Sequence, residues 1–397
     1  MKENHIYKLR GIVQHYQWGG TDFLPRLLHE TNEDNEPWAE YWMGVHPKGT
    51  AKVLTEKGTK DLSLLLQEHP EFLGEEVRKT FGELPFLFKV LDVKEMLSIQ
   101  LHPTREVAVE RFEKEEAAGI PLLAAHRNYK DKNHKPEVMV ALTDFWLLHG
   151  FRHRDASEKS LHTLPGWDKL VPEVAAKGVP GLYEKVMAAT EEEVFSLLEP
   201  LYHHLNEKQE ELTPSHADYW AWQAFLQYSN EGHHDRGIFS IYWFNLVYLA
   251  EGEGIFQDAG IPHAYLRGVN VELMANSDNV LRGGLTPKHI DVPELLDNIN
   301  FEAVVPQILL GEEDHQKGLG YPVPVPDFTL KQCRLAKGEI ATGMENGPRI
   351  LLVISGKASL NGQFFQQGEV AFIPAGVRLD CMNSEERDVH FFVAGVY

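Results

Sequence analysis

Two nine-residue stretches late in the chain share one pattern: Gly252-Glu253-Gly254-Ile255-Phe256-Gln257-Asp258-Ala259-Gly260 and Gly368-Glu369-Val370-Ala371-Phe372-Ile373-Pro374-Ala375-Gly376. Five residues are identical at one constant offset of 116 positions. Each stretch follows an apolar run typical of a buried strand, Leu246–Ala250 in the first copy and Ile350–Ile354 in the second. Patterns this short also recur by chance, but the repeat favours two related β-barrels or jelly rolls.

The two copies differ at one position that carries chemistry. His263 follows the first copy, and the residue at the same offset after the second copy is Leu379. A neutral imidazole can hold a metal ion, whereas a leucine side chain has no ligand atom. We therefore expect the second unit to keep the fold without a metal-binding histidine.

The hydrophobic period changes between residues 155 and 229. Thr190 followed by Glu193 has the sequence form of a helical capping box. Apolar residues then recur at helical spacing from Val194 to Leu205, and residues 214–228 have the pattern of a further helix. This interval is predicted to be a helical insertion between β-rich parts.

Shorter elements are predicted on both sides of the insertion. The expected strands are 84–91, 97–102, 238–249 and 254–256, and the expected helices are 61–68, 71–81 and 293–298. Thr104 has the position of an N-cap for one more helix, which should end at Gly119.

Charge and composition exclude several classes of protein. The 397 residues carry a formal net charge of −21, opposite in sign to most proteins that bind nucleic acids or anionic membranes. The longest apolar run, 239–250, is too short to cross a bilayer, and Met1–His5 lacks the apolar core of a secretion signal. Cys333 and Cys381 have no zinc-site spacing. We expect reduced thiols, a cytoplasmic protein, and a metal held by nitrogen and oxygen ligands.

Four residues that are distant in the chain have the types and local patterns of metal ligands. Gln100 and His102 stand two apart, so on a strand both side chains face one side. Glu137 begins an apolar run, and His263 lies in a turn that leads into another. Two imidazoles, a carboxylate and an amide oxygen suit Zn²⁺ best, with Fe²⁺, Mn²⁺ or Co²⁺ as alternatives. A lone Gln-x-His pair is more often an ordinary hydrogen-bonded pair, so the prediction depends on the whole set.

Polar segments supply further candidates. Arg282 and Lys288 lie in a glycine-containing stretch and could hold a phosphate or carboxylate, although a surface loop gives the same pattern. Ser98 would face the same side of its strand as the predicted amide ligand. His134 and Lys135 precede the predicted carboxylate ligand and are candidate proton carriers.

Other aromatic residues and histidines divide into two groups. The candidates for a pocket wall are Trp18, Trp42 and His46, although a simple core position is the better interpretation for Trp42. The histidines without such context, which we expect to be solvated, are His29, His126, His203, His204, His233 and His234.

Five motifs, in their order and spacing, resemble those of the class I mannose-6-phosphate isomerases. They are Ala39–Pro47, Ser98–Pro103, Asn133–Glu137, Pro262–Leu266 and Asn276–Lys288. The resemblance covers residues 6–300 well and the rest more loosely. The zinc ligands that it implies are Gln100, His102, Glu137 and His263, and the catalytic arginine is Arg282. The departures from the family pattern, none of which removes a ligand, are Tyr41, Leu101, Ile261 and Gly283.

The resemblance also implies the fold class. It is a mainly β chain with a helical insertion, made of two cupin-type jelly-roll barrels plus an α-helical domain. The catalytic barrel would comprise residues 1–154 and 230–300, the helical domain 155–229, and the second barrel, which lacks the metal histidine, 301–397. We expect a monomer or weak homo-oligomer with one Zn²⁺ per chain, no nucleic-acid partner and no membrane partner.

The implied reaction interconverts mannose 6-phosphate and fructose 6-phosphate through a cis-enediol, with a proton moved between C2 and C1. The implied catalytic residues are Arg282, Lys135 and Glu272. The identity of the base stays open among Lys135, His134, Glu272 and Asp278. The expected contacts to the phosphosugar substrate are Ser98, Lys288, His134 and Asp278.

Two other functions stay open. One is a cupin-type Fe²⁺ oxygenase, which anaerobic activity would distinguish. The other is a non-catalytic sugar-phosphate-binding protein that has kept the barrel. A glutamine ligand and the basic 282–288 segment fit a phosphosugar better than they fit an oxygenase, and an intact ligand set with Arg282 argues against the binding protein.

Overall fold

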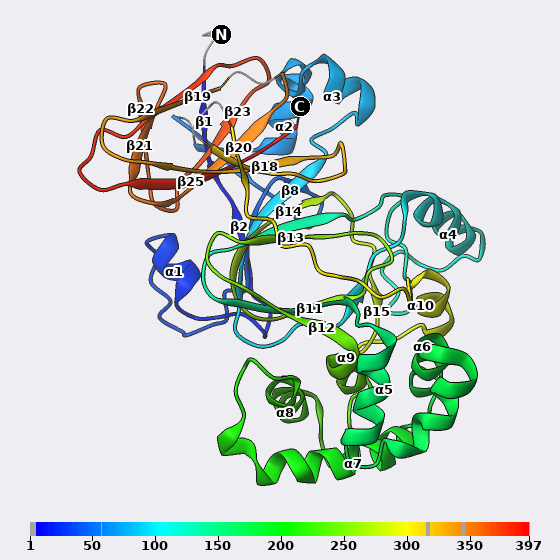
Figure 1. Cartoon of the computed structure of the whole chain (residues 1–397). Coiled ribbons are helices and arrows are strands. Elements are labelled where there is room, and N and C mark those ends of the chain that lie inside the picture. The colour runs from blue at the N-terminus through cyan, green and yellow to red at the C-terminus, as the bar shows by residue number, and fades with distance from the viewer. Residues whose placement is uncertain (1–4, 57, 315–317, 344–345, 397) are drawn as a thin grey trace.

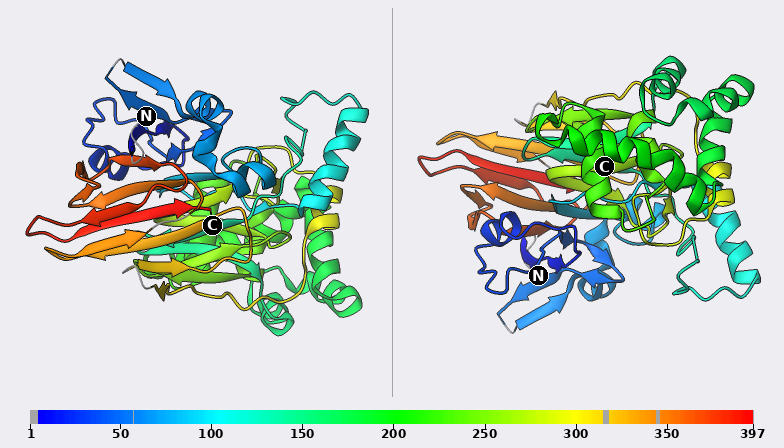
Figure 2. Two further views of the ribbon diagram at one scale, coloured as in Figure 1. Left: turned by 90° about the horizontal axis from the view of Figure 1, so that it is seen from above. Right: turned by 90° about the horizontal axis from the view of Figure 1, so that it is seen from below.

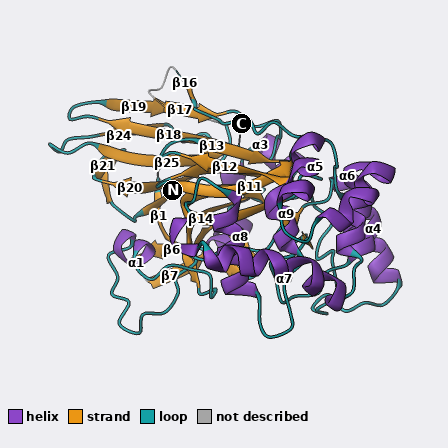
Figure 3. Ribbon diagram, turned by 60° about the horizontal axis from the view of Figure 1, so that its bottom comes forward, coloured by secondary structure: helices purple, strands orange, loops and turns teal. Residues whose placement is uncertain are grey.

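The computed structural model describes residues 5–56, 58–314, 318–343 and 346–396. The prediction about a secretion signal falls mostly on residues 1–4, outside the described residues. Strands fill one side of the molecule and most helices gather at the opposite end, whereas the short N-terminal helices, blue in Figure 1, lie beside the strands (Figures 1 and 3). The predicted β-rich chain with a helical insertion is therefore confirmed at this level.

The first sheet contains ten strands among the described residues. Its main path is β12 (Phe244–Leu249), β11 (Phe145–Phe151), β14 (His263–Ala275), β8 (Phe86–Val93), β3 (Glu40–Met43) and β2 (Ile12–Gln14). The strands off this path are β10 (Glu137–Ala141), β13 (Gly254–Gln257), β9 (Gln100–Leu101) and β15 (Leu281–Arg282). The long strand β14 pairs antiparallel with β8, β9, β10 and β11, so it organises the whole sheet.

The second sheet contains nine strands of the described chain. In order they are β16 (Glu312–Glu313), β17 (Gly318–Tyr321), β18 (Thr329–Leu335), β25 (Val389–Gly395), β20 (Arg349–Ser355), β23 (Val370–Ile373), β1 (Tyr7–Arg10), β6 (Lys52–Thr55) and β7 (Gly58–Asp61). Strand β1 pairs with β23, so N-terminal strands complete the C-terminal sheet. Figure 2 shows the blue N-terminal segments beside the orange and red C-terminal strands.

Two smaller sheets complete the β-structure. The four-stranded sheet consists of β19 (Ile340–Gly343), β24 (Leu379–Met382), β21 (Lys357–Leu360) and β22 (Gln363–Gln366). The two-stranded sheet is a hairpin of β4 (Val45–His46) and β5 (Gly49–Thr50). The strand pairings of the described residues form open sheets and no closed barrel. The cupin-type jelly-roll assignment therefore stays a prediction.

The sequence repeat corresponds to a repeated turn. In the first copy the backbone N–H of Ala250 donates to Glu253 Oε2 at 2.9 Å, and in the second the N–H of Gln366 donates to Glu369 Oε2 at 2.8 Å. The glycines between them have left-handed φ angles of 87° and 78°, which a side chain would disfavour. The same residues therefore build the same turn before β13 and before β23. His263 and Leu379 are the first residues of β14 and β24.

The helical insertion is larger than predicted. Its helices are α5 (Arg154–Thr163), α6 (Val171–Met187), α7 (Glu191–Glu207), α8 (Ala217–Tyr228) and α9 (Gly237–Trp243), with single turns η2 (Asp168–Leu170) and η3 (Gln209–Glu211). Thr190 forms the predicted capping box with Glu193 at the start of α7. These helices share a core with the first sheet, in which Trp167 packs against Phe239 and Trp243.

The prediction of one strand over 238–249 is wrong for its first half. Gly237–Trp243 form helix α9, and β12 begins only at Phe244. Every residue of α9 is buried, and the rings of Phe239 and Trp243, four positions apart, stack at 5.5 Å. A helix enclosed by protein can be apolar on all sides, so the β-favouring residues of this run did not decide its structure.

The remaining helices follow the predictions closely, with one division, except that the first of them in the chain was not predicted. They are α1 (Phe23–Leu27), α2 (Leu62–Glu68), η1 (Pro70–Leu73), α3 (Glu75–Thr80), α4 (Arg105–Ala117) and α10 (Val292–Asn298). Gly74, with a φ of 77°, divides the predicted helix 71–81 into η1 and α3. The hydroxyl of Thr104 caps α4 as predicted, accepting the N–H of Val107 at 3.3 Å. No helix in the described ranges is long and apolar enough to cross a membrane.

Candidate metal centre

Strand register brings three of the predicted residues together. On β9, Gln100 is the register partner of His263 at the start of β14 and of Arg282 on β15. The predicted strand 97–102 is reduced to Gln100–Leu101. Before it, the N–H of Leu97 donates to the carbonyl of Tyr265 on β14, and the N–H of Ile99 donates to that of Gly284. The short strand still places the Gln100 amide next to the His263 imidazole and the Arg282 guanidinium on neighbouring strands.

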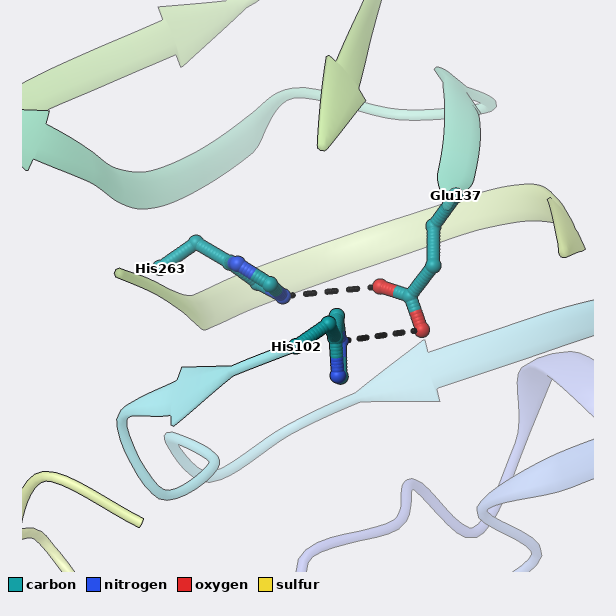
Figure 4. A group of neighbouring side chains, drawn as sticks. All are labelled: His102, Glu137 and His263. Atoms are coloured by element: carbon teal, nitrogen blue, oxygen red, sulfur yellow. Dashed lines mark ion pairs between the residues drawn. The ribbon is translucent and has the colours of Figure 1, made fainter. Parts of the chain in front are cut away.

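Glu137 completes the group from the first position of β10. One carboxylate oxygen lies 3.5 Å from His102 Nε2 and the other lies 3.4 Å from His263 Nε2. Figure 4 shows both imidazoles directed at this carboxylate. One ligand atom from each of the three residues lies within 4.8 Å of the others, which is close enough to share one metal ion.

The hydrogen bonds of the two rings define which nitrogen is available to a ligand. His102 Nδ1 lies 3.0 Å from the carbonyl oxygen of Asn279, and His263 Nδ1 lies 3.0 Å from that of Ile261. A carbonyl only accepts, so each Nδ1 carries the proton and each Nε2 presents a lone pair. His102 Nε2 is buried and makes no hydrogen bond in the described structure.

Burial and charge favour the ligating protonation states. Burial, together with the nearby charge of Lys135, lowers the pKa of His102 to about 4, so the ring is neutral at pH 7. Burial opposes ionisation of Glu137, but Lys135 and His102 hold its pKa well below the usual value. The Lys135 ammonium lies 3.1 Å from Glu137 Oε1. The neutral His102 ring and the ionised Glu137 carboxylate are therefore ready to bind a cation.

A buried ionic cluster stands behind the centre. Lys89 Nζ on β8 lies 2.9 Å from Glu272 Oε2 and 3.6 Å from Glu40 Oε2. The hydroxyl of Tyr265 donates to the other oxygen of Glu272 at 2.9 Å. The predicted catalytic residue Glu272 is thus bound into a network of fully buried side chains. The sequence signal for Lys89 is its position inside an apolar strand, where a charge needs a partner.

The loop that contains Asp278 is fixed to the segment before Glu137. Asp131 accepts the N–H of Asp278 at 2.8 Å and the Ser277 hydroxyl at 2.9 Å. Asp278 in turn lies 2.9 Å from Lys48 Nζ and 3.6 Å from His46 Nε2. The structure therefore places the predicted substrate contact Asp278 in an ion pair near the centre.

Arg282 on β15 has other positively charged side chains near it, Lys288 and Lys48. Arg282 is half-buried, and among the described residues its guanidinium makes no side-chain hydrogen bond or ion pair. Burial lowers the pKa of Lys288, and the charges of Arg282 and Lys48 lower it further. Ser98 is half-buried on the segment before β9. Mutually repelling cations of this kind suit an anionic ligand.

His134, a predicted substrate contact, is engaged with two charged side chains. Its Nε2 lies 3.0 Å from Asp327 Oδ1 and 2.6 Å from Arg105 Nη2. Asp327 is buried and comes from the C-terminal part of the chain. This cluster ties α4, which follows the His102 strand, to the segment that leads to Glu137.

Two further polar residues near the centre were not predicted. His149 is the register partner of His263, and its Nδ1 lies 2.7 Å from Gln257 Oε1. Burial lowers the pKa of His149 to about 4. A histidine within the apolar run of β11 was the available sequence signal.

Two minor predictions had different outcomes. Trp42 is buried, and its ring lies 4.9 Å from that of His46 beside Asp278, so it borders the cluster near the centre. The prediction that His234 is solvated is wrong. It is buried, with its two ring nitrogens 2.7 Å from Glu199 Oε2 and 2.8 Å from Ser229 Oγ.

Comparison with known proteins gives a consistent result. Residues 6–154 match the model of the phosphomannose isomerase type I catalytic domain. The mannose-6-phosphate isomerase of Salmonella typhimurium is 39% identical over 93% of this chain and 95% of its own length. A zinc-bound mannose 6-phosphate isomerase structure superposes with a TM-score of 0.87, at 35% identity over 98% of both chains. The Salmonella typhimurium enzyme bound to fructose 6-phosphate and zinc gives 0.86, with the same identity and coverage. The chain therefore belongs to the type I phosphomannose isomerases, the mannose-6-phosphate isomerase family.

Proposed function

We propose that this isomerase interconverts mannose 6-phosphate and fructose 6-phosphate with one bound Zn²⁺ per chain. The observation that carries the proposal is the convergence of His102, Glu137 and His263 next to Arg282. The names of the relatives support the substrate pair, and the zinc-bound structures support the metal.

The residues fit a zinc ion on their own chemistry. Both histidines use Nδ1 for a carbonyl and turn Nε2 toward one carboxylate, and the buried Nε2 of His102 makes no hydrogen bond among the described residues. We propose Gln100 as the fourth ligand, because its register pairs it with His263. When bound, the ion would act as a Lewis acid toward a sugar oxygen.

The reaction needs a group that carries a proton between C2 and C1 and a charge that stabilises the enediolate between them. We assign the proton to Lys135, because its amine is buried and touches the proposed ligand Glu137. Glu272 stays a second candidate, but its carboxylate already accepts from Lys89 and Tyr265. Arg282 is assigned to the developing negative charge, because it pairs with the strand of Gln100.

The phosphate group needs donors that overcome a net charge of −21. We assign it to Lys288 and Ser98, supported by the positive field of Arg282 and Lys48 at Lys288. The predicted substrate contacts of His134 and Asp278 stay predictions. Each is engaged with another charged side chain, Asp327 for His134 and Lys48 for Asp278.

The finer architecture is also proposed. Two cupin-type units, 1–154 with 230–300 and 301–397, are supported by the repeated turn and by the match to family structures. The helical domain 155–229 would extend through α9. We expect a cytoplasmic location, consistent with two buried free cysteines, and a monomer or weak homo-oligomer.

A coupled assay of the zinc-loaded protein tests the proposed function. Mannose 6-phosphate should be converted to fructose 6-phosphate without oxygen, and His102→Asn should lose both zinc and activity. His390→Asn is the matched control, because His390 is also buried but lies in the second sheet. Oxygen-dependent turnover would favour an oxygenase. Phosphosugar binding without conversion would favour a binding protein.

A further inference from the structure

The backbone just after Arg282 has an unusual conformation. Gly284 has a φ of 120° and Leu285 a φ of 52°. A leucine rarely adopts a positive φ, and such a conformation persists only where neighbouring groups fix it. On one side the segment is bonded to Ile99, the residue just before β9. The N–H of Gly283 donates to the carbonyl of Ile99, and the N–H of Ile99 donates to the carbonyl of Gly284, each at 3.0 Å.

The other side of this segment is held by one carboxylate. Asp235 Oδ1 accepts the N–H of Leu285 at 2.6 Å and of Gly237 at 2.7 Å, and Oδ2 accepts the N–H of Thr286 at 3.0 Å. Asp235 is only 6% exposed. Charge-assisted hydrogen bonds in a buried site are the strong ones, so the two from Leu285 and Thr286 fix the path of the loop, and the one from Gly237 fixes the carboxylate to the start of α9.

Close backbone packing leaves the loop no alternative position on this side. A Cβ on Gly237 would lie 2.5 Å from the nitrogen of Leu285 and 2.8 Å from the carbonyl carbon of Gly284. Gly237 begins α9, and His234, next to Asp235, bonds to Glu199 of α7. The loop after Arg282 therefore rests directly on the helical insertion.

We propose that Asp235 is a positioning residue for Arg282. Its hydrogen bonds attach the loop after Arg282 to the helical insertion and so hold Arg282 in place. The inference depends on the role of Arg282 under the proposed function. The carboxylate of Asp235 accepts from the backbone of Gly237, Leu285 and Thr286, so its effect on Arg282 passes through the backbone of 283–286. Small displacements of a catalytic group cost large factors in rate, which gives this brace a functional consequence.

The test is the variant Asp235→Asn in the zinc-loaded full chain, alone and combined with Arg282→Ala. Asparagine keeps the size of the side chain, but its NH₂ group would face a backbone donor. We expect kcat/KM to fall by about 10- to 100-fold in the wild-type background, with zinc content unchanged. In the Arg282→Ala background the same change should cost less than about twofold, because the group it positions is absent.

Limited trypsin digestion supplies a readout that is independent of turnover. Trypsin cleaves after arginine, and the braced Arg282–Gly283 bond should resist it. Cleavage at this bond should be about tenfold faster in Asp235→Asn, because loss of the brace raises the population of open loop. Gly237→Ala provides a second route to the same result if Asp235→Asn folds poorly. Gly237→Ala keeps the Asp235 carboxylate, but the added Cβ would clash with the backbone of Gly284 and Leu285.

Asp218→Asn is the matched control within the helical insertion. Asp218 accepts the hydroxyl of Tyr242 on α9 at 2.9 Å and does not bond to residues 283–286. It should leave the cleavage rate and kcat/KM unchanged. Equal losses from Asp235→Asn in both backgrounds, or an unchanged cleavage rate, would overturn the proposal. Full turnover by Arg282→Ala alone would instead refute its role under the proposed function, and the trypsin rate would still decide about the brace.

Discussion

Lys89→Met tests whether the buried cluster behind the metal centre contributes stability or chemistry. Lys89 Nζ lies 2.9 Å from Glu272 and 3.6 Å from Glu40, and all three side chains are at most 10% exposed. Each attraction is worth about 4 kcal/mol or more at 4 Å or less with an effective dielectric constant of about 20. Burying the ammonium offsets several kcal/mol of this. Removing the cation leaves two buried carboxylates, and we expect a loss of about 3–5 kcal/mol in the free energy of unfolding.

The assay is urea unfolding of zinc-loaded protein at pH 7.5, followed by circular dichroism, with an unchanged m-value as evidence that only stability has changed. Glu272→Gln should cost less, because Lys89 keeps Glu40. The double variant should lose about 1–3 kcal/mol less than the sum of the single losses. Lys357→Met, at the exposed Lys357–Glu385 pair, is the control and should cost under about 1 kcal/mol.

The pH dependence of the Lys89→Met deficit has a defined sign. Burial raises the pKa of Glu272 above its ordinary value of 4.5, while Lys89 opposes this shift. Without Lys89 the folded carboxyl holds its proton to higher pH than the unfolded one does. The deficit should therefore be small below pH 4.5 and grow as the pH rises through the folded pKa. A loss below about 1 kcal/mol at pH 7.5, or an additive double variant, would refute the reasoning. If Glu272→Gln abolishes turnover at little cost in stability, Glu272 is the base.

Three further outcomes are expected. Arg282→Ala should lower kcat by about 100-fold or more with zinc content unchanged, measured by the coupled assay and metal analysis, and equal zinc loss would make its role structural. Chelation of zinc should lower the urea midpoint of unfolding, because His102, Glu137 and His263 converge in the folded chain and would not hold the ion in the unfolded one. An unchanged midpoint would contradict a shared site. The metal-free protein should lose up to about 3 kcal/mol as the pH falls from 6.5 toward 4, because burial lowers the pKa of His102 to about 4. His102→Asn should remove most of this dependence, and an unchanged pH profile would argue against a buried neutral ring.

The local elements were predictable where the physics is local. The capping box at Thr190 and the N-cap at Thr104 formed as predicted, because both depend only on hydrogen bonds within the first helical turn. The repeat predicted two related β-units, and in the structure Glu253 and Glu369 accept equivalent backbone N–H groups in two equivalent turns. The ligand types were also predictable, since imidazole and carboxylate chemistry belongs to the residue.

Long-range packing decided the rest. Residues 238–243 favour a strand by composition, but enclosure in the helical core made them the helix α9. The spacing of these residues in the sequence predicts neither the Lys89–Glu272 pair nor the contacts of Asp235 with Leu285 and Thr286. Sequence determined which side chains can bind a metal and where the capped helices α4 and α7 begin. Only the tertiary structure brought His102, Glu137 and His263 within 4.8 Å, because contacts between distant segments depend on the total burial of the fold.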